Sequence, residues 1–215
     1  MANQFAIQTR ALTKHYGRTG EIKALTSIDL EIKEGELFGF LGPNGAGKST
    51  TIRTLLGFLH PTSGSASVLG LDVVKDSVEI RRRVGYLPSG FAVYDYMSGR
   101  EYLDHMRALS GRPSLLRHRI MEALELSDAI LKRPVRDYSR GMRQKTAIAL
   151  TFIRPFSVLL VDEPFVGLDE PGRLALIALV VLVIVVVVVM VRAVVAVLLV
   201  PTPAALAVVV LPVVV

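Results

Sequence analysis

A glycine-rich segment around residue 45 has the residue types of a loop that binds phosphate. Its pattern is glycine, four residues, then Gly-Lys-Ser, and its members are Gly42, Pro43, Asn44, Gly45, Ala46, Gly47, Lys48 and Ser49, followed by Thr50. Glycines let successive backbone amides point at one anion, and a helix that begins here adds its positive end. In such loops the lysine neutralises the β- and γ-phosphates and the serine hydroxyl is a magnesium ligand. We therefore expect ATP with Mg²⁺ to bind here, rather than an ordinary glycine-rich turn.

Two acidic residues, Asp162 and Glu163, directly follow the apolar run 158–161. Asp162 is expected to hold magnesium, directly or through water, as the acidic partner of Ser49. Glu163 is expected to polarise the attacking water as a general base. An Asp-Glu pair after a strand is, taken alone, more often a helix cap. The phosphate loop upstream favours the metal and catalytic roles.

A third segment, residues 138–144, reads YSRGMRQ. Ser139 is predicted to cap the helix that follows, and this local role alone accounts for its presence. However, a Ser-x-Gly sequence at a helix start also combines a hydroxyl, backbone amides and the helix dipole into an anion site. Its position shortly before the strand that ends in Asp162 favours the second role, so Ser139 and Gly141 join the candidate nucleotide ligands.

The elements expected around these segments form an α/β sheet. The apolar run 37–41 predicts a buried strand that leads into the loop, and 49–59 predicts the helix after it. Further strands are expected at 5–7, 24–32, 65–71, 84–87 and 158–161, and helices at 75–82, within 99–131 and at 139–152. We expect an α/β fold of the P-loop NTPase (RecA-like) type, with a core sheet, an N-terminal antiparallel β portion and a helical subdomain at about 93–150.

Composition excludes several other kinds of chemistry. The chain has no cysteine, so disulfides, thiolate metal sites and a cysteine nucleophile are excluded. Its net charge of +6 is moderate, and the three arginines at 81–83 are too few to mark a nucleic-acid surface. The first residues lack the continuous apolar core of a secretory signal, which predicts a cytosolic N-terminus.

The character of the sequence changes sharply near residue 173. All 17 glycines and all 19 acidic residues lie at or before Gly172, whereas the 42 residues from Leu174 to Val215 include 19 valines and one charge, Arg192. We expect a nucleotide-binding domain at 1–173 and an unassigned valine-rich tail at 174–215.

Three interpretations of the tail are open. Residues 174–191 are 18 consecutive apolar residues, which is the length of a transmembrane candidate, but a span there would interrupt the sheet before it is complete. Buried strands are the second interpretation, although no turn residue lies between Leu174 and Val200. The third, which we favour, is a continuation that is truncated or frameshifted relative to a natural C-terminus.

The order of the motifs resembles that of the ATP-binding domains of ABC transporters. An aromatic residue, Tyr16, precedes LGPNGAGKST, GYLP, YSRGMRQ, VLLVDEP and GLD, so the resemblance covers residues 5 to about 172. The YSRGMRQ and GYLP segments are similar to those of the subgroup that serves prokaryotic ABC-2-type and drug or antibiotic exporters.

This resemblance implies a dimer that sandwiches the nucleotide. Ser139 and Gly141 of one subunit are expected to close over the γ-phosphate held by Lys48 of the other, and Asp169 to lie at the dimer interface. Tyr16 is expected to stack on adenine, the alternative being an ordinary packed surface aromatic. The implied partners are a second nucleotide-binding domain, identical or different, and a membrane permease subunit. The implied location is peripheral, on the cytoplasmic face of the membrane, and no nucleic-acid partner is expected.

The chain departs from that family at two positions. Ser89 stands after GYLP, where the family usually has Gln or Glu, and a short hydroxyl reaches less far toward the metal and the water. The family also has a histidine some tens of residues after the acidic pair. The four histidines here, His15, His60, His105 and His118, all lie upstream of Asp162.

An ATPase subunit that drives transport, with export favoured, is the function these features predict best. A non-transport ABC ATPase that acts on nucleic acid or ribosomes is one alternative, although such proteins usually carry long coiled coils or two domains. The other is a subunit or fragment that binds ATP without turning it over, which Ser89 and the missing histidine favour.

Overall fold

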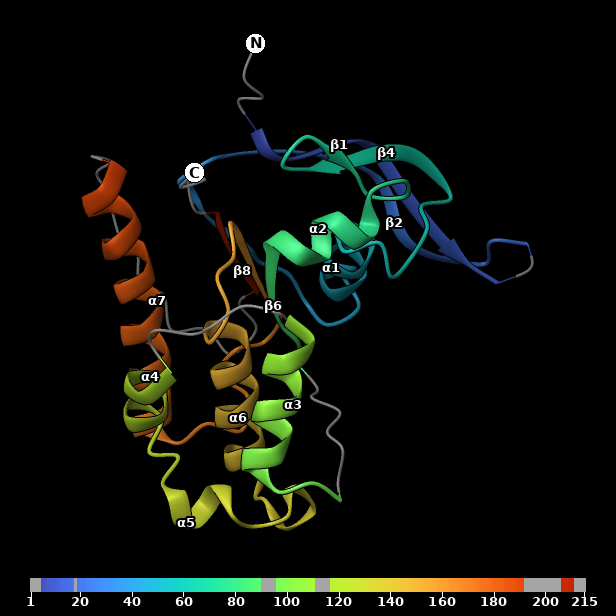
Figure 1. Ribbon diagram of the computed structural model, residues 1–215. Coiled ribbons are helices and arrows are strands. Elements are labelled where there is room, and N and C mark those ends of the chain that lie inside the picture. The colour runs from blue at the N-terminus through green and yellow to red at the C-terminus, as the bar shows by residue number, and fades with distance from the viewer. Residues whose placement is uncertain (1–4, 18, 90–95, 111–116, 192–205, 211–215) are drawn as a thin grey trace.

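The computed structural model describes residues 5–17, 19–89, 96–110, 117–191 and 206–210, with side chains as far as Val181 except that of Ser110. Figure 1 shows the N-terminal strands over α1 and α2 on one side and the remaining helices gathered on the other. The elements are β1 (Phe5–Tyr16), β2 (Ile22–Lys33), β3 (Leu37–Phe40), α1 (Lys48–Leu55), β4 (Ser63–Val68), β5 (Leu71–Asp72), α2 (Ser77–Arg83), β6 (Val84–Leu87), α3 (Gly99–Ser110), α4 (Arg117–Ala123), α5 (Asp128–Leu131), the 3-10 turn η1 (Val135–Asp137), α6 (Arg140–Phe152), β7 (Val158–Val161), α7 (Glu170–Val191) and β8 (Leu206–Val210).

The N-terminal strands form an antiparallel sheet in the order β2-β1-β4-β5. Ile7 of β1 pairs with Ile32 of β2 on one side and with Val68 of β4 on the other, and all three side chains are buried. They belong to one hydrophobic cluster with Ile52 and Leu55 of α1. This sheet is therefore packed against the helix that follows the phosphate loop.

The second sheet has the order β3-β8-β7-β6 and carries the ends of the motif strands. β6 and β7 are parallel, and β8 is antiparallel to both β3 and β7, so β3, β7 and β6 all run in the same direction. The register aligns three pairs near their ends: Phe40 with Leu206, Val161 with Ala207, and Val161 with Leu87. The carboxyl ends of the three parallel strands therefore lie level at one edge, which is where open α/β sheets bind ligands.

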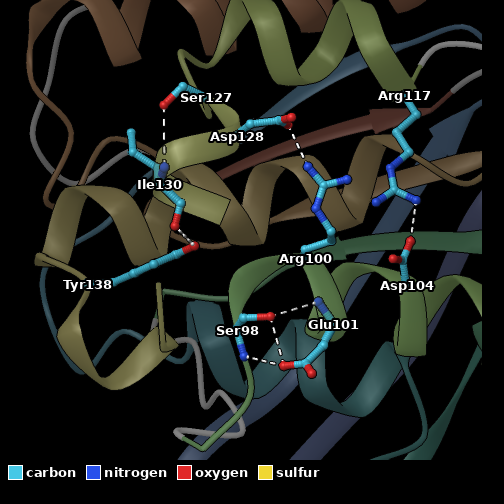
Figure 2. A network of polar contacts seen from close by, with 9 residues as sticks. All are labelled: Ser98, Arg100, Glu101, Asp104, Arg117, Ser127, Asp128, Ile130 and Tyr138. Carbon is cyan, nitrogen blue, oxygen red and sulfur yellow. Dashed lines mark hydrogen bonds and ion pairs between the residues drawn. The ribbon is translucent and has the colours of Figure 1, made fainter. Parts of the chain in front are cut away.

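Helices α3 to α6 form the helical part of the molecule. α3 begins with a reciprocal cap, in which the Glu101 carboxylate accepts a hydrogen bond from the Ser98 amide at 2.8 Å and the Ser98 hydroxyl accepts one from the Glu101 amide (Figure 2). Two ion pairs join α3 to its neighbours: Arg100 with Asp128 of α5, and Arg117 of α4 with Asp104. Ile148 of α6 and Leu159 of β7 share one core cluster, which attaches these helices to the second sheet.

The expected fold class is confirmed: a mixed α/β fold with an antiparallel β portion and a set of helices between the motif strands. Several boundaries differ from those expected. β1 continues to Tyr16 and not only to Ile7, the expected strand 65–71 is divided into β4 and β5, and α1 ends at Leu55 and not at Leu59. Gly57 adopts φ 69°, the left-handed conformation that commonly ends a helix just past its cap.

The tail contains both a helix and a strand. α7 begins at Glu170 and continues to Val191, so it runs through the expected boundary at residue 173, and the division into 1–173 and 174–215 stays a prediction. β8 lies inside the second sheet, between β3 and β7. Within the part of the chain whose side chains are described, which in α7 ends at Val181, no helix is long and apolar enough to cross a membrane.

Candidate nucleotide-binding site

The phosphate loop leaves β3 and ends in the first turn of α1. Gly45 and Gly47 have φ values of 84° and 87°, which the loop needs to turn its amides inward. Gly47 is the N-cap of α1 and supplies no side-chain hydrogen bond, and the first turn of the helix contains no acidic residue. Because the first amides of a helix have no partner within it, this end is left positive and open to an anion.

The ammonium group of Lys48 lies at the phosphate loop. Its side chain is only 7% exposed, and Nζ donates hydrogen bonds to the carbonyl oxygens of Gly42 at 2.6 Å and Pro43 at 2.9 Å. An ammonium group has three donors, so one remains beyond these two contacts. Ser49 and Thr50, the next two residues, are partly exposed in the first turn of α1. Asn44 and Ala46 are exposed at the outer side of the loop.

The loop is fitted closely against β2. A Cβ atom at Gly47 would lie 2.4 Å from the carbonyl oxygen of Ala24, so no other residue fits there without movement. Tyr16 of β1 pairs with Ile22 of β2 and thus lies near the part of β2 that contacts the loop. Its ring is partly exposed, with the Lys14 ammonium 5.3 Å from the ring centroid. Tyr16 therefore pairs with the strand that contacts the loop, and its stacking on adenine stays a prediction.

Asp162 is buried at the end of β7. Its side chain is 1% exposed, and neither carboxylate oxygen has a hydrogen-bond partner among the described residues. Its backbone amide donates to the Leu87 carbonyl at 2.8 Å, which fixes the residue against β6. Burial raises the pKa of Tyr86, and the nearby charge of Asp162 raises it further. A buried carboxylate with no partner is costly unless a cation is bound to it, so Asp162 has the chemistry of a metal ligand.

Magnesium fits this site only together with a nucleotide. Among the described residues, no group of three or more His, Asp or Glu side chains could hold a metal alone. Magnesium commonly binds through one or two protein oxygens plus substrate phosphates. β3 and β7 are separated by one strand, so their ends lie roughly 10 Å apart. Asp162 directly follows the end of β7, whereas Ser49 lies in the first turn of α1, beyond the loop that leaves β3.

Glu163 has an unusual backbone conformation. Its φ is 50°, in the left-handed region that residues other than glycine rarely adopt. Such a conformation costs about 1–3 kcal/mol and persists only where neighbouring structure imposes it, which happens most often at functional sites. The residue is partly exposed directly beyond the buried Asp162, so its carboxylate is next to the candidate metal ligand in the chain.

Ser139 and Gly141 lie at the start of α6. Ser139 is the N-cap, and its hydroxyl accepts a hydrogen bond from the Met142 amide at 3.2 Å, so the predicted cap is present. Gly141 contacts the loop after β7, because a Cβ there would be 3.1 Å from the Gly167 carbonyl oxygen. In Figure 1 the segment before α6 lies in the lower half of the molecule and α1 in the upper half. Their nucleotide contacts in a dimer stay a prediction.

Two further residues can be placed. Ser89 follows β6 at the same sheet edge, and residues 90–95 lie outside the described part of the chain. Asp169 caps α7, since its Oδ1 accepts from the Gly172 amide at 2.9 Å. That amide is the main cause of the lowered pKa of Asp169, and Lys145 adds to the effect.

A hollow of about 650 Å³ between α3, α4 and α5 is separate from these motifs. None of the candidate nucleotide ligands lines it, and Arg100 and Arg117 are each paired with an aspartate there (Figure 2). We therefore assign the site to the strand ends and not to this hollow.

Two side chains of α6 that were not among the candidate site residues, those of Gln144 and Lys145, contact the loop after Glu163. Gln144 Nε2 donates to the Pro164 carbonyl at 3.4 Å, and Lys145 Nζ lies 3.5 Å from Asp169 Oδ1. The signal in the sequence is that both polar residues lie in the helix expected at 139–152, shortly before the apolar residues 147–149.

The two glycines of the loop give a matched test of this packing. Gly47→Ala and Gly45→Ala both place a side chain at φ near 85°, but only the Cβ at residue 47 meets other atoms within 4 Å. We expect Gly45→Ala to lower the free energy of unfolding by about 1 kcal/mol, and Gly47→Ala to lower it by at least about 2 kcal/mol more. Urea unfolding followed by circular dichroism measures both. Equal losses would show that the contact with Ala24 is not made.

A family model described as ABC transporter matches residues 25–166 of the chain. The daunorubicin resistance ATP-binding protein DrrA2 of Streptomyces coeruleorubidus is 39% identical over 173 residues, which cover 79% of this chain and 52% of that protein. The ABC transporter ATP-binding protein NatA of Bacillus subtilis is 40% identical over 155 residues, 69% of this chain and 62% of that protein. The chain thus spans about half to two thirds of the length of these relatives.

Solved structures have the same fold. The structure titled as the ATP-binding subunit of an ABC transporter matches with a TM-score of 0.70 and 26% identity, over 81% of this chain and 73% of the other. A dimeric cassette, MJ0796 with ADP and phosphate, also matches at 0.70, and at 24% identity it supports the fold alone. Together with the family match and the level ends of the motif strands, these similarities identify the chain as a member of the ABC transporter family that carries its ATP-binding domain.

Proposed function

We propose that this domain binds ATP with Mg²⁺ and hydrolyses it to drive transport through a membrane permease. The observation that carries the proposal is the buried, unpartnered carboxylate of Asp162, which is level with the end of the strand that leads into the phosphate loop. A cation is needed at Asp162 and an anion at the amides of α1, and a magnesium–nucleotide complex supplies both.

Each residue has a separate part in this chemistry. Lys48 and the loop amides hold and orient the phosphates, while Ser49 and Asp162 are the protein ligands of the metal. When bound, the metal neutralises charge on the β- and γ-phosphates. Glu163 orients the attacking water and accepts its proton as the water oxygen bonds to the γ-phosphorus, while the bond from that phosphorus to the bridging oxygen breaks and ADP leaves.

The quaternary arrangement is also part of the proposal. In the proposed dimer, the start of α6, where Ser139 caps the helix and Gly141 approaches the Gly167 carbonyl, closes on the nucleotide of a second ATP-binding domain. NatA is named as an ABC transporter ATP-binding protein, which supports a role in transport, and DrrA2 as a daunorubicin resistance ATP-binding protein, for which we propose drug export as the basis. The domain would then lie peripherally on the cytoplasmic face of the membrane.

A second candidate is binding of ATP without turnover. Ser89 replaces a longer polar residue at the edge of the sheet, and all four histidines precede Asp162. Both departures weaken the positioning of the water and the γ-phosphate, while the phosphate loop and Asp162 are unaffected. Phosphate release by the unmodified chain separates the two functions.

Replacing Glu163 tests the catalytic part directly. Glu163→Gln removes the proton acceptor but keeps the size of the side chain, so we expect phosphate release to fall about 10²- to 10⁴-fold with little change in ATP affinity. Glu34→Gln, at an exposed turn before β3, is the matched control and should be unaffected. A phosphate-release assay and equilibrium titration measure the two quantities. An unchanged rate in Glu163→Gln would exclude the assigned role.

Replacing Asp162 tests the metal site without any measurement of activity. Asp162→Asn removes a buried charge that has no described partner, so the nucleotide-free chain should become more stable to urea by about 1 kcal/mol or more. Asp137→Asn, at a side chain that is 52% exposed, should change stability by no more than about 0.5 kcal/mol. If Asp162→Asn instead destabilises the free chain, the carboxylate already has a partner and the proposed metal role loses its basis.

A further inference from the structure

We propose that Lys145 is a positioning residue: with Gln144 it holds the loop 163–169, which carries Glu163, against the helix that begins at Ser139. The catalytic consequence rests on the proposed function. The structural claim, that α6 holds this loop in place, does not.

Lys145 joins three segments of the chain. Its Nζ lies 3.0 Å from Glu125 Oε2, in the turn after α4, and 3.5 Å from Asp169 Oδ1, at the end of the loop. The lysine side chain is 11% exposed, whereas those of Glu125 and Asp169 are 65% and 61% exposed. A nearly buried ammonium needs opposite charges close by, so the two carboxylates are drawn to a fixed point on α6.

Two other contacts lie along the same loop. The amide of Gln144, a residue only 5% exposed, donates to the Pro164 carbonyl at 3.4 Å. Farther on, a Cβ at Gly167 would lie 2.9 Å from Arg140 Cγ, so this part of the loop has close contact with the first turn of α6. Contacts with α6 thus lie near the start, the middle and the end of the loop.

The loop needs such support because its internal bonding is weak. Its backbone hydrogen bonds among the described residues are long, with Val166 donating to Glu163 at 3.2 Å and Leu168 to Phe165 at 3.3 Å. The left-handed conformation of Glu163 must be imposed from outside the residue, and Pro164 is its immediate neighbour. The contacts from α6 therefore determine where the Glu163 carboxylate is directed.

Hydrogen–deuterium exchange on the full chain tests the structural claim. Lys145→Met keeps the length of the side chain and removes its charge, so we expect amides of residues 163–173 to exchange about tenfold faster while those of 48–55 are unchanged. Lys145→Arg should stay within about threefold of the unmodified chain, because a charged donor remains. Lys132→Met, at an exposed lysine, is the matched control. No change at 163–173 in Lys145→Met, or an equal rise everywhere, overturns the proposal.

Steady-state kinetics tests the consequence for catalysis. In Lys145→Met, a displaced Glu163 should lower kcat about tenfold or more. The KM for ATP should stay within about twofold of that of the unmodified chain, and Lys145→Arg should restore kcat. If the unmodified chain releases no phosphate, the proposed turnover fails while the exchange measurement still decides the role of Lys145. If Lys145→Met does not fold, Gln144→Met is measured in its place. In Gln144→Met, faster exchange confined to residues 163–173 supports the proposal, and exchange equal to that of the unmodified chain overturns it.

Discussion

The buried charge of Asp162 is the constraint on which the arrangement of the site depends. A carboxylate that is 1% exposed and has no hydrogen-bond partner among the described residues is costly in the nucleotide-free chain. Lys48 does not relieve it, because that ammonium donates to the carbonyls of Gly42 and Pro43. In the proposed function, a cation bound at the end of β7 would remove this cost.

The second sheet sets the spacing between the phosphate loop and the Asp162 carboxylate. β8 pairs with both β3 and β7, so the two strands are held one position apart and their ends stay level. The phosphate loop and Asp162 consequently both begin at the same edge of the sheet. α6 has a different task, because it packs on β7 with one face and contacts the loop after Glu163 with its first turns. A movement of α6 would carry that loop with it, which links the helix start at Ser139 to the residue expected to handle the water.

The sequence predicted the elements that carry the motifs because each motif is a local device, while the roles of the site residues stay predictions. A glycine-rich loop, a strand ending in Asp162 and a cap at Ser139 each depend on a few neighbouring residues, and their strands and helices were expected at nearly the observed positions. The contacts of Lys145 could not be predicted, since they join residues about 20 positions away in both directions. The conformation of Glu163 likewise depends on packing and not on its own residue type.

The tail shows a different limit of the sequence. A run composed mainly of valine has no polar residue to mark which face is buried or where a strand begins, so strand register is poorly specified. Neither α7 through residues 174–191 nor the antiparallel entry of β8 between β3 and β7 was predicted. The sequence shows how long the hydrophobic segment is, but it does not show where the segment forms a helix and where it forms a strand.

Calorimetric titration of the unmodified chain with ATP, in magnesium and again in excess EDTA, tests the central claim most directly. Without the metal, the Asp162 carboxylate repels the phosphates, so affinity should fall about tenfold or more, a difference of about 1.4 kcal/mol or more. Equal affinity in the two buffers would contradict the assignment of Asp162 as a metal ligand. No binding in either buffer would contradict the proposed nucleotide site itself.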